Sequence, residues 1–213
     1  MRSVTRAARA GSTAPICIVC LPGAYHAPEH FVEAGFVARV SERALPIDLV
    51  LVDPELRHLG DRRFRRQLRR EIVMPARAAG SRTLWLAGIS LGGFMALDYA
   101  VAHPGDFDGL CLLSPYLGNR MLIAEIARAP GLAAWNAGEL GDDEERRIWG
   151  FIQTRRTDLP QLYLGYGRED RFADAHRLLA DSLPPGTASV VPGGHDWRTW
   201  TALWEDFLES RFV

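Results

Sequence analysis

Six short apolar runs, separated by longer amphipathic segments, are the feature that most restricts how this 213-residue chain can fold. Most of the runs are apolar throughout rather than alternating, which is typical of strands covered on both faces of a sheet. A repeated strand, helix, strand order predicts a doubly wound, mostly parallel α/β sheet with right-handed crossovers. The predicted strands are residues 16–21, 47–52, 83–88, 109–114, 161–166 and 188–191, and the predicted helices are residues 29–43, 61–79, 91–103, 171–182 and 197–210.

The length of the chain and its 47% content of hydrophobic residues suit one α/β domain over residues 1–213. One segment, residues 119–157, interrupts the strand–helix rhythm with helix formers, turn residues and an acidic run. An insertion after the carboxyl end of a strand is where α/β enzymes often carry a lid or a substrate wall. We therefore expect a small helical lid insertion here, and an ordinary pair of surface helices fits the same residues.

Charge and hydropathy narrow the range of partners. The formal net charge is −1, so no global basic field is expected to recruit nucleic acid or an anionic membrane. The first fifteen residues carry arginines but no apolar core, and the apolar run after them is too short for a membrane span. We expect a frayed N-terminus on a soluble, cytoplasmic protein. The oligomeric state is left open.

Six arginines between Arg62 and Arg70 fall on one arc of a predicted helix, and apolar residues fall on the other. The preferred interpretation is a solvated face on a helix that packs against the sheet. A polyanion or the acidic patch of a partner protein is the alternative.

The three cysteines do not indicate a disulfide framework or a redox motif. Cys17 and Cys20 lie within a predicted strand, three positions apart, so their side chains point to opposite faces. A redox-active pair of cysteines would instead lie in a loop that leads into the N-terminus of a helix, where the thiolate is stabilised. We predict that both are buried structural residues, and that Cys111 is too.

The segment Gly88-Ile89-Ser90-Leu91-Gly92 is a candidate nucleophile elbow. The pattern alone is common, but here a predicted strand runs directly into it and a predicted helix follows. A sharp reversal of this kind crowds the positions two before and two after its central residue, and glycine relieves that crowding. The Ser90 hydroxyl is expected above the sheet edge, and Gly93 should let the helix approach the sheet closely.

A serine hydroxyl needs a histidine base, and the base needs a carboxylate to orient it. Asp170 follows one predicted strand and His195 follows the last, which gives the order serine, acid, histidine. Glu169 and Asp174 are neighbouring carboxylates, but Asp174 fits the next helix. Asp170 could also serve as an N-cap. Asp196 is predicted to be an N-cap rather than the acid.

An acyl-transfer site also needs two donors for an oxyanion. We predict the backbone N–H groups of Ala24, in the loop after the first apolar run, and of Leu91, after the serine. The predicted substrate-binding residues are Tyr25, His26, Tyr116 and Trp197.

Together, the stretch "GISLGG", Asp170 and His195 resemble the elbow, acid and base of an α/β-hydrolase fold serine hydrolase, over nearly the entire chain. The stretch "PGAYHAPEHF" resembles the oxyanion loop of small esterases of the methylesterase and hydroxynitrile-lyase-like branch, while "GGHDWRTW" is similar to the histidine loop of the esterase D-like group. The resemblance implies a trimmed α/β-hydrolase fold of about six strands, without the first two strands usual in the family.

The function we expect is hydrolysis of a small-molecule carboxylic ester through an acyl-enzyme, without a metal or a cofactor. A thioesterase or an acyltransferase with the same three residues is the alternative within this chemistry. A catalytically silent binding module is the alternative outside it. Dinucleotide binding is not favoured, because the loop after the first strand lacks a Gly-x-Gly-x-x-Gly turn.

Overall fold

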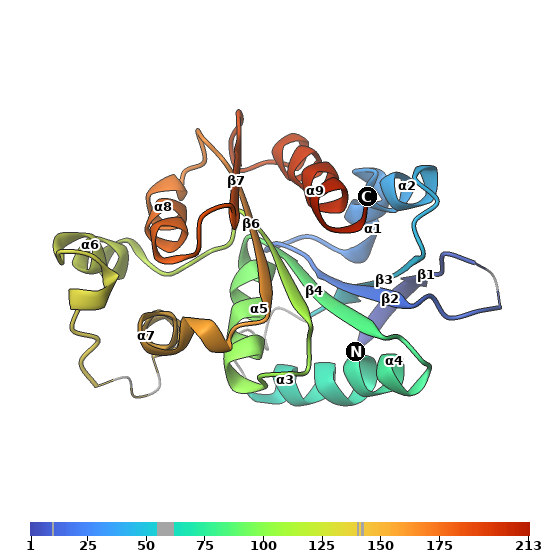
Figure 1. Ribbon diagram of the computed structural model, residues 1–213, viewed down its shortest axis with the longest axis horizontal. Helices are drawn as coiled ribbons and strands as arrows, with labels where there is room; N and C mark the ends of the chain where they lie inside the picture. Colours follow the sequence, from blue (N-terminus) through green and yellow to red (C-terminus); the bar gives the residue numbers. More distant parts are fainter. Residues whose placement is uncertain (10, 55–61, 140, 142) are drawn as a thin grey trace.

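The computed structural model describes residues 1–9, 11–54, 62–139, 141 and 143–213. A seven-stranded sheet in the order β1-β3-β2-β4-β5-β6-β7 runs through the molecule (Figure 1). All neighbouring strands are parallel except β1 and β3. This arrangement confirms the predicted α/β sheet. The strands are β1 (Arg2–Arg6), β2 (Ile16–Leu21), β3 (Ile47–Asp53), β4 (Thr83–Ile89), β5 (Gly109–Leu113), β6 (Gln161–Gly167) and β7 (Ala188–Val191).

The strand β1 corrects the prediction of a frayed N-terminus and of about six strands. It pairs antiparallel with β3, and Arg2 lies opposite Asp53. Four of its five residues are exposed, so it contains no apolar run from which a strand could be predicted. The buried Asp48 carboxylate accepts the N–H groups of Ala8 and Ala14, which holds the connection to β2. Backbone pairing therefore defines this edge strand, with little contribution from side-chain burial.

Helices cover both faces of the sheet (Figure 1). One face packs against side chains of five helices, and the other against side chains of three. Cys17 belongs to the first core layer, and Cys20 and Cys111 to the second, so the prediction of buried cysteines on opposite faces is confirmed. The first layer is α3 (Arg62–Leu68), α5 (Leu91–Ala102), α6 (Arg120–Arg128), α7 (Glu144–Arg155) and α8 (Ala173–Ser182); the second is α1 (Pro28–Glu33), α2 (Phe36–Glu42) and α9 (Trp197–Phe212).

Two predicted helices are interrupted. The helix predicted over residues 29–43 is divided into α1 and α2 at Gly35, which has a left-handed φ of 85°. The helix predicted over residues 61–79 continues from α3 through a π-helical turn at Arg69–Val73 into α4 (Met74–Ala78). Its predicted first residue, Asp61, lies outside the described residues, as does His58.

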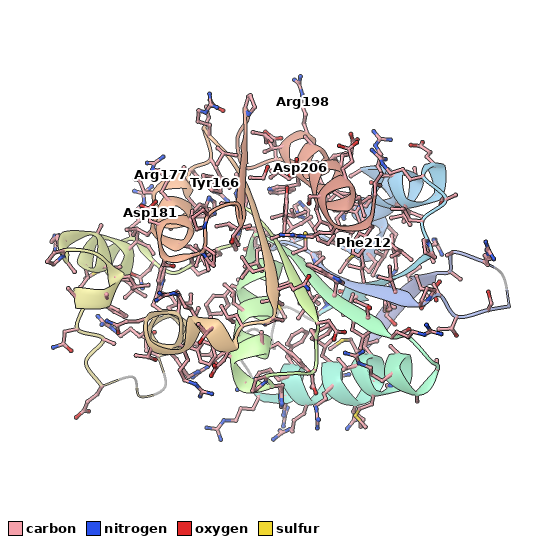
Figure 2. The ribbon with its side chains drawn as sticks, viewed as in Figure 1. Tyr166, Arg177, Asp181, Arg198, Asp206 and Phe212 are labelled. Atoms are coloured by element: carbon pink, nitrogen blue, oxygen red, sulfur yellow. The ribbon has the colours of Figure 1, made fainter. Side chains whose placement is uncertain are left out.

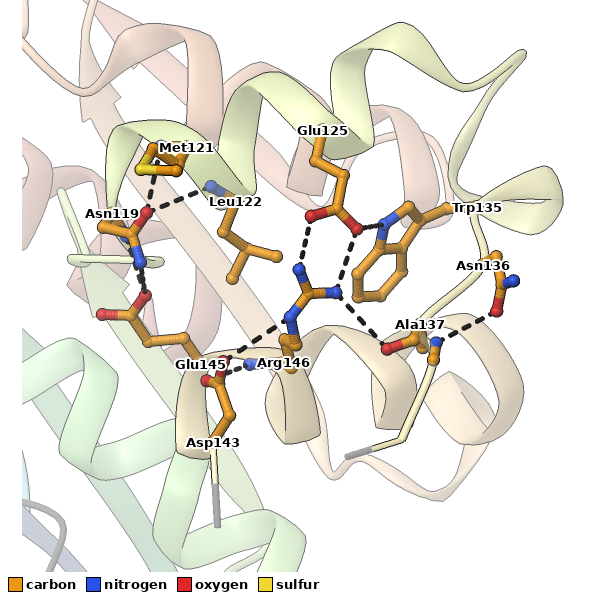
Figure 3. Close-up of polar contacts among 11 residues, drawn as sticks. Asn119, Met121, Leu122, Glu125, Trp135, Asn136, Ala137, Asp143, Glu145 and Arg146 are labelled. Atoms are coloured by element: carbon orange, nitrogen blue, oxygen red, sulfur yellow. Dashed lines mark hydrogen bonds and ion pairs between the residues drawn. The ribbon is translucent and has the colours of Figure 1, made fainter. Parts of the chain in front are cut away.

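The segment over residues 119–157 is braced by polar contacts between its two helices (Figure 3). Arg146 of α7 donates through two guanidinium nitrogens to the Glu125 carboxylate of α6. The Trp135 indole N–H donates to Glu125 as well, at 2.9 Å. Glu145 of α7 accepts the side-chain amide of Asn119 at 2.7 Å. These contacts join the first turn of α7 to α6 and to its N-cap residue, Asn119.

The carboxyl ends of the parallel strands meet at one edge of the sheet. The loops after β2, β4, β5, β6 and β7 therefore lie side by side in the order of the strands. No helix within the described residues is long and apolar enough to cross a membrane.

Candidate active site

Ser90 stands between β4 and α5, at the predicted reversal. Its φ of 52° and ψ of −114° lie in a region that side-chain-bearing residues rarely adopt. The end of β5 fixes this conformation from both sides. The Ser90 N–H donates to the Leu113 carbonyl at 3.0 Å, and the Ser90 carbonyl accepts the Tyr116 N–H at 2.8 Å. The hydroxyl is left partly exposed at the sheet edge.

The glycines around Ser90 are required by close backbone contacts. A Cβ on Gly88 would lie 2.3 Å from the Gly92 carbonyl oxygen, and a Cβ on Gly92 would lie 2.3 Å from that of Leu21. A Cβ on Gly93 would lie 2.7 Å from the Pro115 side chain, directly after β5. The prediction that these three glycines allow a tight reversal and a close approach of α5 is confirmed.

The structure brings Ser90, His195 and Asp170 into one hydrogen-bonded row. His195 Nε2 lies 2.9 Å from Ser90 Oγ, and His195 Nδ1 lies 2.8 Å from Asp170 Oδ2. With the proton on Nδ1, His195 donates to Asp170 and accepts from the Ser90 hydroxyl. The Asp170 side chain is fully buried and that of His195 is 9% exposed. This is the geometry that a histidine base needs to take the proton of a serine nucleophile.

The buried Asp170 carboxylate is kept ionised by its partners. Burial by itself raises the pKa of Asp170, but the hydrogen bonds from His195 and from the Phe172 N–H outweigh it, so the pKa lies below its usual value. The second of these bonds, at 2.9 Å to Oδ1, caps the turn before α8. Asp170 therefore caps this turn, which was the alternative role considered for it, and contacts His195 at the same time.

The other carboxylates point elsewhere. Glu169 accepts the Gly193 N–H and so holds the histidine loop, while Asp174 lies in the first turn of α8 and pairs with Arg177. Asp196 accepts the Thr199 N–H at 2.9 Å and is the N-cap of α9, as predicted. Asp170 is thus the acid that contacts His195.

The loop after β2 lies directly over Ser90. A Cβ on Gly23 would be 3.5 Å from the Ser90 Cβ, and the His26 N–H closes a turn onto the Gly23 carbonyl. Within the described residues, neither the Ala24 N–H nor the Leu91 N–H donates to a protein acceptor. Both N–H groups are therefore left without a partner, and their role as oxyanion donors stays a prediction.

The predicted substrate-binding residues lie in three different surroundings. Tyr25 is 89% exposed and has a φ of 64°. His26 and Trp197 pack against each other with ring centroids 5.1 Å apart. Burial and the nearby histidines His30 and His195 lower the pKa of His26. Tyr116 is half-buried after β5, and its hydroxyl donates to Glu145 of α7 at 2.7 Å.

The aromatic residues that touch His195 were not predicted. Phe172 and Trp200 each lie edge-on to the His195 ring, with ring centroids 5.1 Å apart. Trp197, expected to be near His195, packs against His26 and Trp200 instead. Trp200 lies in the first turn of α9, the helix that begins two residues after His195. The sequence places it close to His195 along the chain, but no sequence signal marks its contact or that of Phe172 with the ring.

His176 of α8 is a further residue beneath the site. It is fully buried, and its Nε2 lies 2.9 Å from the carbonyl oxygen of Pro115, the residue before Tyr116. Because a carbonyl can only accept, the proton of the neutral ring is on Nε2. His176 thus ties α8 to the segment that holds the Ser90 carbonyl.

Comparison with known proteins gives a family match and a partial sequence match. The family described as Putative esterase matches residues 58–208. An acetyl esterase of Caldicellulosiruptor saccharolyticus is 27% identical over 135 residues, which are 54% of this chain and 49% of that protein. The matched region therefore spans about half the length of that relative.

Several solved structures share the fold. The serine hydrolase FphF of Staphylococcus aureus superposes with a TM-score of 0.69 over 95% of this chain and 85% of its own, at 11% identity. Est1E of Butyrivibrio proteoclasticus has a TM-score of 0.65 over 98% and 93% of the two chains, at 17% identity. A ferulic acid esterase has a TM-score of 0.68 over 93% and 84%, at 16% identity. At these identities the similarity is one of fold, and it identifies the sheet and its helices as an α/β-hydrolase fold.

Proposed function

Because the chain belongs to the Putative esterase family and has an α/β-hydrolase fold, we propose that it hydrolyses carboxylic esters of small molecules with Ser90 as the nucleophile. The observation that carries the proposal is the hydrogen-bonded row from Ser90 Oγ through the His195 ring to Asp170. The three residues follow three different strands, and their side chains meet in one hydrogen-bonded row. Separate structural roles for the three residues would not require them to meet.

In the proposed first step, Ser90 Oγ attacks the acyl carbon while His195 Nε2 takes the hydroxyl proton. Asp170 accepts the Nδ1–H bond throughout and stabilises the imidazolium that forms. The tetrahedral intermediate then expels the alcohol, which receives the proton from His195 Nε2. An acyl-Ser90 ester remains. In the second step a water molecule gives a proton to His195 Nε2 and its oxygen attacks the acyl carbon. The second tetrahedral intermediate then releases the acid, and the departing Ser90 Oγ takes the proton back from His195, which regenerates both residues.

The negative oxygen of each intermediate would accept the N–H groups of Ala24 and Leu91. Backbone donors at fixed positions need no reorganisation when charge develops, and losing one such donor typically costs about 3 kcal/mol of barrier. The strained φ of Ser90 supports this role, because it directs the hydroxyl out of the reversal and leaves the Leu91 N–H at the first position of α5. No part of the mechanism draws on a metal or a cofactor.

Several finer points belong to the same proposal. The acyl donor is an ester in preference to a thioester, and the acyl group passes to water. The chain acts as a single α/β-hydrolase domain, with residues 119–157 as a braced wall beside the site. A cytoplasmic location remains a prediction.

The decisive experiment assays the purified protein against p-nitrophenyl esters and acyl-CoA thioesters of graded chain length. We expect ester hydrolysis, with kcat lowered at least a thousandfold in Ser90→Ala and His195→Ala. Asp170→Asn should lose activity strongly, and Glu169→Gln is the matched control on the adjacent carboxylate. Activity that survives Ser90→Ala would contradict the mechanism. A preference for acyl-CoA would favour a thioesterase. If no acyl donor reacts and no fluorophosphonate label attaches, the chain is a binding module.

A further inference from the structure

A groove of about 790 Å³ lies between α6 and α8, next to the proposed active site. Tyr116 and Phe172 form the end of the groove nearest the site, and their rings meet edge-on at 5.9 Å. Phe172 also touches the His195 ring, and the Tyr116 N–H binds the Ser90 carbonyl. The groove therefore begins one side chain away from the nucleophile and the base. Its volume is within the range of sites for small molecules.

The walls of the groove are apolar along the two helices. Ile123 and Ala127 of α6 stand on one side, and Ala175 and Leu178 of α8 stand on the other. Glu125 of α6 does not line the groove, and its carboxylate is bound by Trp135 and by Arg146 of α7 (Figure 3). An alkyl chain would therefore be buried between the helices without leaving a wall group unsatisfied.

Two unpaired cations stand at the end nearest the site. Arg120 begins α6 and Arg171 precedes Phe172, and neither pairs with a carboxylate among the residues that the structure describes. The Arg171 guanidinium lies over the Phe172 ring at 4.9 Å, which holds it at the groove wall.

The other charges of the groove do not cancel these two. Arg177 pairs with Asp174 on the surface of α8. Asp181 lies further along α8 (Figure 2) and also lines a second hollow, which contains Arg156. The end of the groove beside the site thus has two arginines against one nearby carboxylate, Glu145, which accepts the Tyr116 hydroxyl and the Asn119 amide. This end therefore keeps a positive balance, while the walls along the two helices are apolar.

We propose that this groove binds the acyl chain of an ester that carries a second, ionised carboxylate, so that the preferred substrates are monoesters of dicarboxylic acids. The inference rests on the proposed esterase function. The acyl carbon lies at Ser90, so the short methylene chain passes the Tyr116 and Phe172 rings at the near end of the groove. The free carboxylate then pairs with Arg120 or Arg171 at that same end. An arginine is suited to this task, because its planar donors match a carboxylate with two parallel hydrogen bonds.

The test compares two substrates of nearly equal shape, p-nitrophenyl hydrogen adipate and its neutral methyl ester, p-nitrophenyl methyl adipate. We expect kcat/KM to be roughly three- to fivefold higher for the charged ester, because an exposed charge pair contributes about this much. The ratio should fall in high salt, which screens the pair. Arg120→Gln and Arg171→Gln should each lower the ratio roughly twofold, and the double variant should bring it close to 1.

Arg128→Gln is the matched control, because Arg128 is an exposed arginine of the same helix that does not line the groove. It should keep the wild-type ratio. A disturbance of the fold would lower kcat/KM for both esters and leave their ratio unchanged. Equal rates for the two esters, or a preference that survives both arginine substitutions, would overturn the inference. The proposed function fails separately, if hydrolysis of either ester persists in Ser90→Ala.

Discussion

At the scale of single residues, His176 shows how burial selects one protonation state. Its Nε2–H is used by the Pro115 carbonyl, and its Nδ1 is buried without a partner. A second proton would therefore have no acceptor. Burial is the main reason that the pKa of His176 falls to about 4. The charges of His195 and Arg177 act in the same direction, while the Pro115 hydrogen bond and the Asp170 charge oppose it.

The pKa of His176 predicts a loss of stability in mild acid. In the unfolded chain the His176 ring has an ordinary pKa of about 6.5. Between that pH and about pH 4, His176 is therefore protonated in the unfolded state but neutral in the folded state. The free energy of unfolding should therefore decrease by about 2 kcal/mol between pH 7 and pH 5 from this residue. Urea unfolding at the two pH values measures it.

The control for this prediction is a pair of variants. In His176→Gln the amide can still donate to Pro115 but cannot titrate, so the loss between pH 7 and pH 5 should shrink by about 2 kcal/mol. His103→Gln replaces a half-buried histidine at the end of α5. This variant should reduce the loss of unfolding free energy between pH 7 and pH 5 by a smaller amount. An unchanged pH dependence in His176→Gln would show that His176 is protonated in the folded protein.

At the scale of elements, Asp98 of α5 connects three helices. Its buried carboxylate accepts Arg65 of α3 and Arg147 of α7. Arg65 was predicted to lie on the solvated face of its helix, but it is buried and points toward α5. The prediction was wrong for this residue because helical periodicity places it at the border of the polar arc, and only the position of Asp98 on another helix decides which way it turns.

Removing Arg65 should be costly because it leaves a buried charge with half of its compensation. We expect Arg65→Gln to lower the free energy of unfolding by about 3 kcal/mol. Arg147 is 31% exposed, so Arg147→Gln should cost about 1 kcal/mol. Arg66→Gln, on the exposed side of the same helix as Arg65, should change stability by less than about 0.5 kcal/mol. Urea midpoints rank the three variants, and equal costs for Arg65 and Arg66 would contradict the assignment.

At the scale of the whole molecule, the proposed site depends on neighbouring strands of the sheet. Ser90 and His195 are 105 residues apart in the chain, yet their side chains are in hydrogen-bond contact. Their positions follow from the adjacent order of β4, β5, β6 and β7. The row therefore exists only when these strands are paired.

Loss of activity and loss of the fold should therefore coincide. As urea increases, esterase activity and tryptophan fluorescence should follow one transition, because Trp200 packs against His195 and reports on the same packing. Parallel measurements on the same samples check this expectation. Activity lost at clearly lower urea than fluorescence would mean that the site opens locally before the sheet unfolds.

The sequence alone determined the parallel part of the sheet and the residues at its carboxyl edge. Apolar runs identify buried strands because a strand covered on both faces has no polar side to alternate with. The elbow glycines, Asp170 and His195 could be selected because each directly follows such a run. Their chemical roles remain proposals, but their meeting at one edge follows from parallel strands.

What only the tertiary structure decided lies where side-chain burial gives no local signal. The strand β1 is almost entirely exposed and exists through its pairing with β3. Phe172 and Trp200 enclose His195, and Arg65 turns inward to Asp98, because of neighbours distant in the chain. The hydropathy of a residue indicates whether its side chain is buried or exposed to water. Which other side chains a buried residue contacts depends on how the helices pack against the sheet, and only the folded chain determines that packing.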